Sequence, residues 1–217
     1  MRAVACDLGG VLIPAPFDAF AALELRVGAV AGAVRAVNAR NPDDNAWARL
    51  ERREITVEGF VDLFTAEAHH LGHRLPALEV IDLVTSTSPA RDFADEAMVE
   101  ALETCRDRGL RLALITNNVR PLGDSPGSGW LFELFDTVIE SCVVATRKPE
   151  PEIYELALGR LGTRAEETVM LDDLGVNLKA ARALGLQTLK VVDPKDAARQ
   201  LLDLLSTPAA RGQERAL

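Results

Sequence analysis

Two adjacent aspartates, Asp172 and Asp173, follow directly on the apolar run 168–171. Neighbouring carboxylates at the exit of a buried strand repel each other unless a cation lies between them. Two other apolar runs also end in side chains that carry oxygen, one in Asp7 and the other in Thr116. Because ligands bind at the carboxyl ends of the strands in parallel α/β sheets, we expect these side chains to meet in one pocket.

The charges of such a pocket indicate its chemistry. Asp7, the aspartate pair and Lys148 would together carry two net negative charges, and closely packed carboxylates raise one another's pKa. A divalent cation removes that cost, and oxygen ligands without His or Cys favour Mg²⁺, which typically shares its shell with a substrate phosphate. Thr116 and Lys148 can donate to phosphate oxygens, and Asp7 beside the cation can act as a nucleophile. The sequence thus predicts a Mg²⁺ site that accepts a phosphoryl group.

The segments that carry these residues alternate between strand and helix patterns. Short apolar runs predict strands at 2–6, 110–115, 137–139, 168–171 and 187–191. This alternation indicates a Rossmann-like α/β core with a parallel sheet and right-handed crossovers. From 17 to 89 the periodicity is helical instead, with helices predicted at 17–26, 29–39, 44–52, 56–71 and 77–84. We therefore expect a core over 1–15 and 91–205, an inserted all-helical cap over 16–90 and a disordered tail over 206–217.

Composition excludes several classes of protein. The formal net charge of −9 argues against nucleic-acid binding, because phosphate backbones select basic surfaces. No apolar run approaches the length of a membrane span, and the N-terminus enters a strand pattern without a charged and apolar leader. We therefore expect a cytoplasmic protein that does not bind membranes; the sequence indicates no oligomeric state. The cysteines are widely spaced and lack a CxxC motif, which predicts buried free thiols at Cys6, Cys105 and Cys142.

Four segments resemble the haloacid dehalogenase superfamily in their order and spacing. They are CDLGGV at 6–11, LITNN at 114–118, RKPEP at 147–151 and LDDLGVN at 171–177. The stretch from 139 to 179 is similar to the N-terminal phosphatase domain of soluble epoxide hydrolase and to the haloacid-dehalogenase-like domain of some multidomain acyl-CoA dehydrogenases. The resemblance covers nearly the whole chain, and the helical insertion stands where the family has a C1-type cap.

The resemblance implies a role for each matching residue. Asp7 would be the nucleophile and a Mg²⁺ ligand, and Asp173 would be the second side-chain ligand. Thr116 and Lys148 would bind the phosphate and stabilise the intermediate. Asp172 would act as a partner to metal-bound water or to Lys148.

Three further positions complete the expected site. Asn177 would support the loop after Asp173, and Asn117 would face the substrate. Gly9 departs from the family pattern, because phosphatases of this family usually carry an aspartate there whose carbonyl binds Mg²⁺ and whose side chain protonates the leaving group. The carbonyl of Gly9 remains as a metal ligand, but the general acid, which typically contributes about 10²- to 10⁴-fold, is missing. The resemblance implies a Mg²⁺-dependent phosphatase of small phosphate monoesters that is slow on alkyl phosphates and loses least on acyl, anomeric sugar or aryl phosphates.

Two other functions stay open. A haloacid dehalogenase also uses the aspartate without a partner acid, although such enzymes generally lack the paired acidic metal site. A binding or regulatory module could keep the fold and the metal with little turnover. A phosphonatase, by contrast, needs a cap lysine, and the segment from 17 to 89 contains none.

The remaining polar and aromatic candidates have ordinary interpretations. His69 and His73 have the i, i+4 spacing of a metal pair, but no third ligand is evident, so we interpret them as solvated. Trp47 and Trp130 could line the pocket, although packing is the default role. The cap arginines could meet an anionic substrate, but interleaved acidic residues favour surface salt bridges at Arg35, Arg40, Arg49, Arg52 and Arg53.

Overall fold

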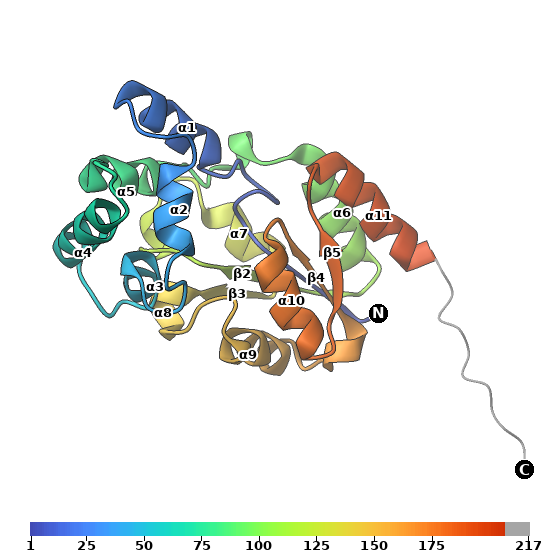
Figure 1. The fold of residues 1–217 in the computed structure, drawn as a ribbon. Helices are drawn as coiled ribbons and strands as arrows, with labels where there is room; N and C mark the ends of the chain where they lie inside the picture. Colours follow the sequence, from blue (N-terminus) through green and yellow to red (C-terminus); the bar gives the residue numbers. More distant parts are fainter. Residues whose placement is uncertain (207–217) are drawn as a thin grey trace, which may run out of the picture.

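A parallel sheet of five strands, in the order β3-β2-β1-β4-β5, forms the centre of the molecule (Figure 1). The computed structural model describes residues 1–206. The strands are β1 (Ala3–Cys6), β2 (Arg111–Thr116), β3 (Thr137–Glu140), β4 (Thr168–Asp172) and β5 (Gln187–Lys190). All four strand pairings are parallel, which confirms the predicted Rossmann-like α/β fold.

Helices cover both faces of the sheet, which explains the continuous apolar runs of its strands. The core helices are α6 (Glu96–Asp107), α7 (Gly129–Leu134), α8 (Ser141–Val144), α9 (Pro151–Leu161), α10 (Gly175–Ala183) and α11 (Pro194–Ser206). Short 3₁₀ helices occupy Arg91–Phe93, Leu122–Asp124 and Ala165–Glu167. Val4 and Cys6 of β1 pack with α6, α7 and α11 in one apolar cluster, while Ala3 and Ala5 pack with α9 and α10 in another.

The segment between β1 and β2 contains a group of helices with an apolar cluster of its own. They are α1 (Phe17–Arg26), α2 (Ala33–Ala39), α3 (Ala46–Glu51), α4 (Val57–His70) and α5 (Ala77–Thr85), and they gather at one end of the molecule in Figure 1. Trp47 and Phe60 pack edge to face with ring centroids 4.8 Å apart, and Phe60 stacks on Phe64 at 5.3 Å. We call α1–α5 the cap; its exact limits at 16 and 90 stay a prediction.

The largest difference between a predicted and an observed cap helix lies at the start of α2. The helix predicted over 29–39 begins only at Ala33, because Gly32 adopts a left-handed conformation with a φ of 82°. The buried carboxylate of Glu24 accepts hydrogen bonds from the backbone N–H groups of Gly32, at 2.6 Å, and Val34, at 2.8 Å. A distant side chain therefore caps this helix, which apolar periodicity cannot indicate.

Three other predictions can be compared with the structure. Cys6, Cys105 and Cys142 are buried free thiols, as predicted. The tail predicted over 206–217 lies outside the described residues, apart from Ser206 at the end of α11. Within residues 1–206, the helices are all too short or too polar to span a membrane.

Candidate active site

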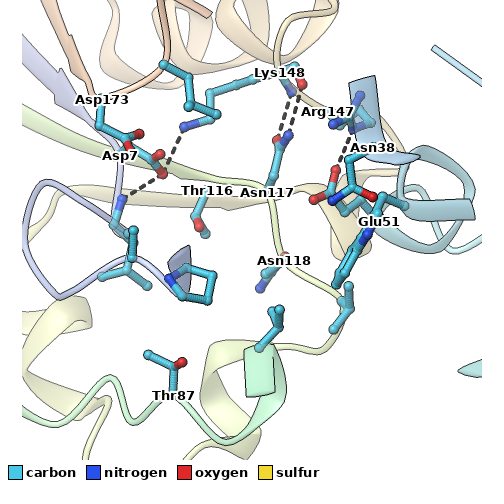
Figure 2. Close-up of a pocket in the computed structure, with 18 of the residues that line it drawn as sticks. Asp7, Asn38, Glu51, Thr87, Thr116, Asn117, Asn118, Arg147, Lys148 and Asp173 are labelled. Carbon is cyan, nitrogen blue, oxygen red and sulfur yellow. Dashed lines mark hydrogen bonds and ion pairs between the residues drawn. The ribbon is translucent and has the colours of Figure 1, made fainter. Parts of the chain in front are cut away.

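The carboxyl ends of three adjacent strands bring the predicted residues together (Figure 2). Thr116 is the last residue of β2, Asp7 directly follows β1, and Asp172 is the last residue of β4. Since β1 pairs with both β2 and β4, these positions are neighbours at one edge of the sheet. The backbone N–H of Asp7 also donates to the carbonyl of Leu171 at 2.9 Å, which fixes the exit of β1 against β4.

Lys148 links two of the aspartates. Its ammonium Nζ lies 2.8 Å from Asp7 Oδ1 and 2.8 Å from Asp172 Oδ2, and its side chain is only 1% exposed. Burial alone would lower the pKa of Lys148, but the carboxylates of Asp172 and Asp7 raise it above its ordinary value. The lysine therefore carries a buried positive charge between two acidic groups.

Asp172 is fully buried, and hydrogen-bond donors surround it. Its Oδ1 accepts from the backbone N–H of Leu174 at 2.8 Å, and Asn177 Nδ2 donates to both carboxylate oxygens at 3.0 and 3.1 Å. The ion pair with Lys148 occupies Oδ2 as well. Asn177 and Asp172 together therefore hold the lysine, while the side-chain contacts of Asp7 within residues 1–206 involve only Oδ1 and leave Oδ2 to meet a ligand.

The aspartates form a group that could hold a cation. Ligand oxygens of Asp7, Asp172 and Asp173 all lie within 4.8 Å of one another, and within residues 1–206 this is the one group of at least three acidic, His or Cys side chains so arranged. Burial, opposed by Lys148 and reinforced by Asp172, raises the pKa of Asp7 to about 7. Burial and the charge of Asp172 raise the pKa of Asp173 to about 6. Lys148 alone does not balance these carboxylates, and oxygen ligands with such raised pKa values suit a hard cation such as Mg²⁺.

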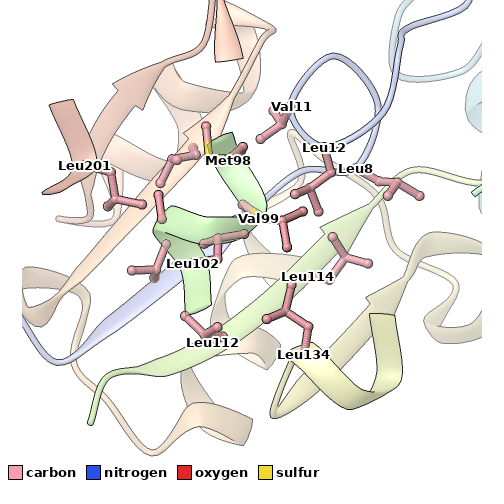
Figure 3. Packing of buried hydrophobic residues seen from close by; sticks show 14 of the residues in the cluster. Leu8, Val11, Leu12, Met98, Val99, Leu102, Leu112, Leu114, Leu134 and Leu201 are labelled. Carbon is pink, nitrogen blue, oxygen red and sulfur yellow. The ribbon is translucent and has the colours of Figure 1, made fainter. Parts of the chain in front are cut away.

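The loop after Asp7 is anchored in the apolar core. The backbone N–H of Leu12 donates to the carbonyl of Leu8 at 2.8 Å, and both side chains are buried. Figure 3 shows Leu8, Val11 and Leu12 in the same cluster as Met98 and Val99 of α6. These buried side chains therefore hold the loop in place beside the site.

Gly9 lines the cavity, and no atom lies within 4 Å of the position that a Cβ would take there. The space for an acidic side chain therefore exists although the residue lacks one. Gly10 is different, because its φ is +74° and a Cβ would lie 2.6 Å from Asp173 Oδ2. The structure therefore requires a glycine at position 10 and sets no steric limit on the side chain at position 9.

The residues that end β2 have different surroundings from one another. Thr116 lines the cavity, and its hydroxyl makes no hydrogen bond to another residue of the described chain, so it can donate to a ligand. Asn117 also lines the cavity, but its amide holds the backbone of Lys148. The N–H of Lys148 donates to Asn117 Oδ1 at 2.8 Å, and Asn117 Nδ2 donates to the Lys148 carbonyl at 2.9 Å. The structure therefore gives Asn117 a part in placing the lysine that the sequence did not indicate.

A cavity of about 500 Å³ opens above these residues, between the core and the cap. Its cap wall includes Phe17, Phe20, Arg35, Asn38, Trp47 and Glu51. Of the cap arginines, Arg49 pairs with Asp44 at 2.9 Å on the surface, as expected, and Arg35 lines the cavity. Trp47 both packs against Phe60 and lines the cavity, whereas Trp130 donates its indole N–H to the carbonyl of Pro89 at 2.8 Å.

Comparisons with known proteins agree on one family. A family model described as haloacid dehalogenase-like hydrolase matches residues 1–185. The chain is 35% identical over 215 residues to acyl-CoA dehydrogenase family member 10 of Mus musculus, covering 97% of this chain and 20% of that protein. It is 32% identical over 226 residues to bifunctional epoxide hydrolase 2 of Sus scrofa, covering 96% of this chain and 40% of that protein. The chain therefore spans less than half the length of these two relatives.

A shorter relative and a solved structure extend the comparison. The sesquiterpene phosphatase astK of Aspergillus oryzae is 27% identical over 166 residues, covering 75% of this chain and 81% of that protein. Among solved structures, a dehalogenase with an intermediate complex superimposes with a TM-score of 0.66 at 20% identity, covering 95% of this chain and 98% of that chain. At this identity the superposition supports the fold alone.

Proposed function

This chain belongs to the haloacid dehalogenase-like hydrolase family, and we propose that it is a Mg²⁺-dependent phosphatase of small phosphate monoesters that acts through an aspartyl-phosphate on Asp7. One observation carries the proposal. A single buried ammonium, that of Lys148, lies 2.8 Å from both Asp7 and Asp172, next to the free hydroxyl of Thr116 and the carboxylate of Asp173. Cationic, hydroxyl and carboxylate groups in this arrangement suit phosphoryl transfer.

In the first step, a carboxylate oxygen of Asp7 attacks phosphorus while the bond from phosphorus to the ester oxygen breaks. Asp7 Oδ1 accepts from the backbone N–H of Leu8 at 2.7 Å and pairs with Lys148, so the carboxylate is held in one orientation. The Thr116 hydroxyl and the Lys148 ammonium donate to the phosphoryl oxygens and stabilise their negative charge. The leaving alkoxide takes a proton from water, because Gly9 has no acidic side chain that could supply one.

In the second step, water attacks the phosphorus of the aspartyl-phosphate, which releases inorganic phosphate and restores the Asp7 carboxylate. Lys148 keeps its position through both steps, since Asn117 holds its backbone and Asp172 holds its ammonium. The role of these residues is to orient and stabilise charge rather than to transfer protons.

The residues fit Mg²⁺ as the resident cation. Asp7 and Asp173 would hold it through their carboxylates, and Gly9 would hold it through its backbone carbonyl. When bound, the ion supplies positive charge that stabilises the phosphoryl oxygens. The raised pKa values of Asp7 and Asp173 support this assignment, because both carboxylates are buried and the single charge of Lys148 does not balance the acidic group.

The lack of an acid at Gly9 limits the class of substrate. A phosphate ester whose leaving group is a weak base needs no proton in the transition state, so we expect acyl, anomeric sugar and aryl phosphates to react faster than alkyl phosphates. The cap wall adds a preference for small molecules with apolar parts, since Phe17, Phe20 and Trp47 line the cavity. A relative named as a sesquiterpene phosphatase supports phosphatase chemistry in a pocket with apolar walls.

Gly9 also favours one alternative, haloacid dehalogenation, in which no leaving-group acid is needed. The acidic group formed with Asp173 argues against it, because a carboxylate substrate gains nothing from additional buried negative charge. A binding module without turnover is the other alternative. It would bind Mg²⁺ and phosphate but release no product.

A substrate panel separates these functions. We expect aryl and acyl phosphates to be hydrolysed with Mg²⁺ and not with EDTA, and Asp7→Asn to abolish the activity. Metal-independent release of halide from 2-haloacids, without phosphate release, would favour the dehalogenase. Binding of Mg²⁺ and inorganic phosphate by calorimetry without turnover of any substrate would favour the binding module.

A further inference from the structure

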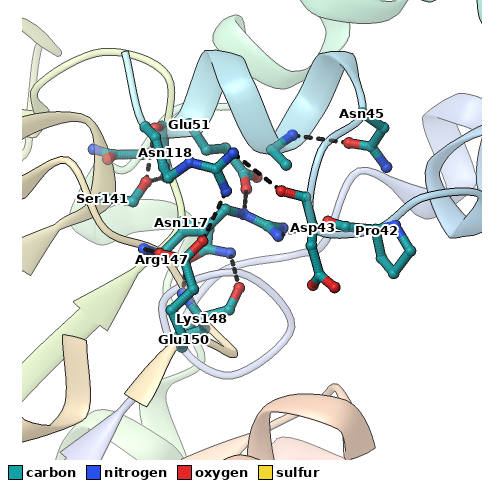
Figure 4. Close-up of polar contacts among 12 residues, drawn as sticks. Pro42, Asp43, Asn45, Glu51, Asn117, Asn118, Ser141, Arg147, Lys148 and Glu150 are labelled. Carbon is teal, nitrogen blue, oxygen red and sulfur yellow. Dashed lines mark hydrogen bonds and ion pairs between the residues drawn. The ribbon is translucent and has the colours of Figure 1, made fainter. Parts of the chain in front are cut away.

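The segment that carries Lys148 is bound to the cap on both sides of the lysine (Figure 4). One residue before it, Arg147 Nε lies 2.5 Å from Glu51 Oε2 in the cap. Two residues after it, Glu150 Oε1 lies 2.7 Å from Arg52 Nη1, also in the cap. Because Glu51 and Arg52 are consecutive, one end of α3 contacts both flanks of the lysine.

In these two contacts, the order of charges along the chain is opposite in the cap and in the core. The cap presents a negative and then a positive residue, Glu51 and Arg52, whereas the core presents a positive and then a negative one, Arg147 and Glu150. Both arginine side chains are largely buried, with 12% of Arg52 and 15% of Arg147 exposed. A displacement of the cap that moved one pair out of register would bring like charges together, so the arrangement selects one position of α3.

Backbone contacts strengthen the same junction. Arg147 Nη1 donates to the carbonyl of Pro42 at 3.1 Å, and Arg52 Nη2 donates to the carbonyl of Asp43 at 3.0 Å. Both carbonyls belong to the loop before α3, and Pro42 and Asp43 line the cavity. The junction therefore also fixes part of the cavity wall.

The other polar contacts between cap and core lie close to the linkers. Arg120 donates to the carbonyl of Thr85 at 2.8 Å, and Trp130 donates to the carbonyl of Pro89 at 2.8 Å. Within residues 1–206, the remaining hydrogen bonds and ion pairs between cap and core all involve Arg147 or Glu150. The junction at α3 is thus the polar connection that the cap must break in order to swing away from the site.

Within the core, two sets of hydrogen bonds hold the segment 146–150, which carries Lys148. Glu150 Oε2 accepts from Thr146 Oγ1 at 2.8 Å and from the backbone N–H of Arg147 at 3.0 Å, which closes the segment on itself. Asn117 then holds the backbone of Lys148. A change at Glu150 or Arg147 is therefore passed directly to the residue that stabilises the phosphoryl group.

We propose that Glu51 and Arg52 of the cap are positioning residues for Lys148, so that the lysine is fully ordered only when the cap is closed. This inference rests on the proposed function for the role of Lys148. Closure would then couple exclusion of water to completion of the site, since an open cap loosens the lysine and a closed cap fixes it. The protein would then have its lowest catalytic activity when the pocket is open to solvent.

Amide hydrogen exchange in the metal-free protein tests the coupling without any assumption about the reaction. The reporter amides are those of Arg147, Lys148 and Glu150, which are all hydrogen-bonded in this structure, where the junction is formed. Glu51→Arg places a positive charge against Arg147 and should speed their exchange about tenfold, as expected for a partly buried pair. The double variant Glu51→Arg/Arg147→Glu restores opposite charges but not the hydrogen bond from Arg147 to Pro42, so it should return the exchange of Lys148 and Glu150 to within about threefold of the wild type.

A matched control is the reversal Glu79→Arg, which breaks the ion pair with Arg26 inside the cap and adds the same charge. It should leave the reporter amides unchanged. Unchanged exchange in Glu51→Arg, or equally fast exchange in the double variant, would overturn the proposal. If Glu51→Arg does not fold, Glu51→Gln and salt near 1 M in the wild type make the same comparison, because both weaken the pairs without reversing charge.

Steady-state kinetics then separate positioning from general stability. A poorly placed Lys148 should lower kcat in Glu51→Gln by about tenfold while KM for an aryl phosphate changes less than threefold. An effect on KM alone would contradict the positioning role. If no variant or wild type shows turnover, the proposed function fails, while the exchange result still decides the coupling.

Discussion

Gly10 leaves open the space that the carboxylate of Asp173 occupies, since a Cβ on Gly10 would lie 2.6 Å from Asp173 Oδ2. Its φ of +74° also lies in the left-handed region that favours glycine. Two loops that are distant in sequence, after β1 and after β4, therefore meet at a contact that only a hydrogen atom permits. Both loops carry proposed Mg²⁺ ligands, so the contact should influence the metal.

Gly10→Ala should weaken Mg²⁺ binding by about tenfold or more, because groups that orient metal ligands typically contribute this much. Isothermal titration calorimetry measures the affinity directly. The control is Gly28→Ala, which has a similar φ of +69° but no atom within 4 Å of its Cβ. Equal Mg²⁺ affinities in the two variants would mean that displacement of Asp173 has no effect on the metal.

Gly9→Asp should restore the missing leaving-group acid. The structure offers room for the new side chain, since nothing lies within 4 Å of a Cβ at this position. We expect hydrolysis of alkyl phosphates to accelerate by about 10- to 100-fold, the lower part of the usual range for general acids, with little change for aryl phosphates. Gly9→Asn is the matched control, because its amide has the same shape and no acidic proton. Equal rates in the Asp and Asn variants would show that protonation does not limit the reaction.

The sequence predicted the positions of the candidate site residues best where a residue stands at the end of a strand. Asp7, Thr116 and Asp172 all meet because parallel strands end at the same edge of the sheet, and apolar runs locate those ends well. Asn117 lines the cavity, where it was expected to face the substrate, and its amide also binds the backbone of Lys148, which was not expected. Its partner lies 31 residues away, and no local pattern identifies it.

The contacts between cap and core were the least predictable feature. The cap arginines were interpreted as surface salt bridges, which is right for Arg49 and incomplete for Arg52. Arg52 pairs with the nearby Glu54 at 2.6 Å but also with Glu150, 98 residues further along the chain. Composition shows that such charges can pair locally, whereas only the packing of α3 on the core selects the distant partner.

The metal-free protein should lose stability as pH rises from about 4 to about 7. Burial raises the pKa of Asp7 to about 7 and that of Asp173 to about 6, whereas an aspartate in an unfolded chain has a pKa of about 3.9. Between these values the folded chain keeps protons that the unfolded chain has lost. The resulting stabilisation is therefore full below the unfolded pKa and disappears as pH passes through the folded pKa.

Thermal unfolding in EDTA at several pH values measures this loss. The control is the double variant Asp7→Asn/Asp173→Asn. Its Tm should fall less over this pH range than the wild-type Tm does, because neither amide titrates. Added Mg²⁺ should raise the wild-type Tm most above pH 7, where both carboxylates are ionised and bind the ion. Parallel pH curves for wild type and the double variant would contradict the raised pKa values.

Arg53→Gly should stabilise the protein. Arg53 follows the junction residue Arg52 and has a φ of 63°, a left-handed conformation that costs a residue with a Cβ about 1 kcal/mol or slightly more. Its backbone N–H donates to the carbonyl of Leu50 at 2.9 Å, and its side chain is exposed, so glycine should relieve the strain and keep the turn. We expect the free energy of unfolding in urea to rise by up to about 1 kcal/mol, because the freedom that glycine adds to the unfolded chain offsets part of the relief.

Arg53→Ala separates relief of strain from loss of the side chain, because alanine retains the Cβ and removes the guanidinium. It should leave the free energy of unfolding within about 0.5 kcal/mol of the wild type, as is usual at exposed positions. If both variants gained the same stability, the cause would be the removed charge, since Arg52 and Arg53 are adjacent cations at the end of α3. If Arg53→Gly lost stability instead, the conformational freedom that glycine adds to the unfolded chain would outweigh the strain it relieves.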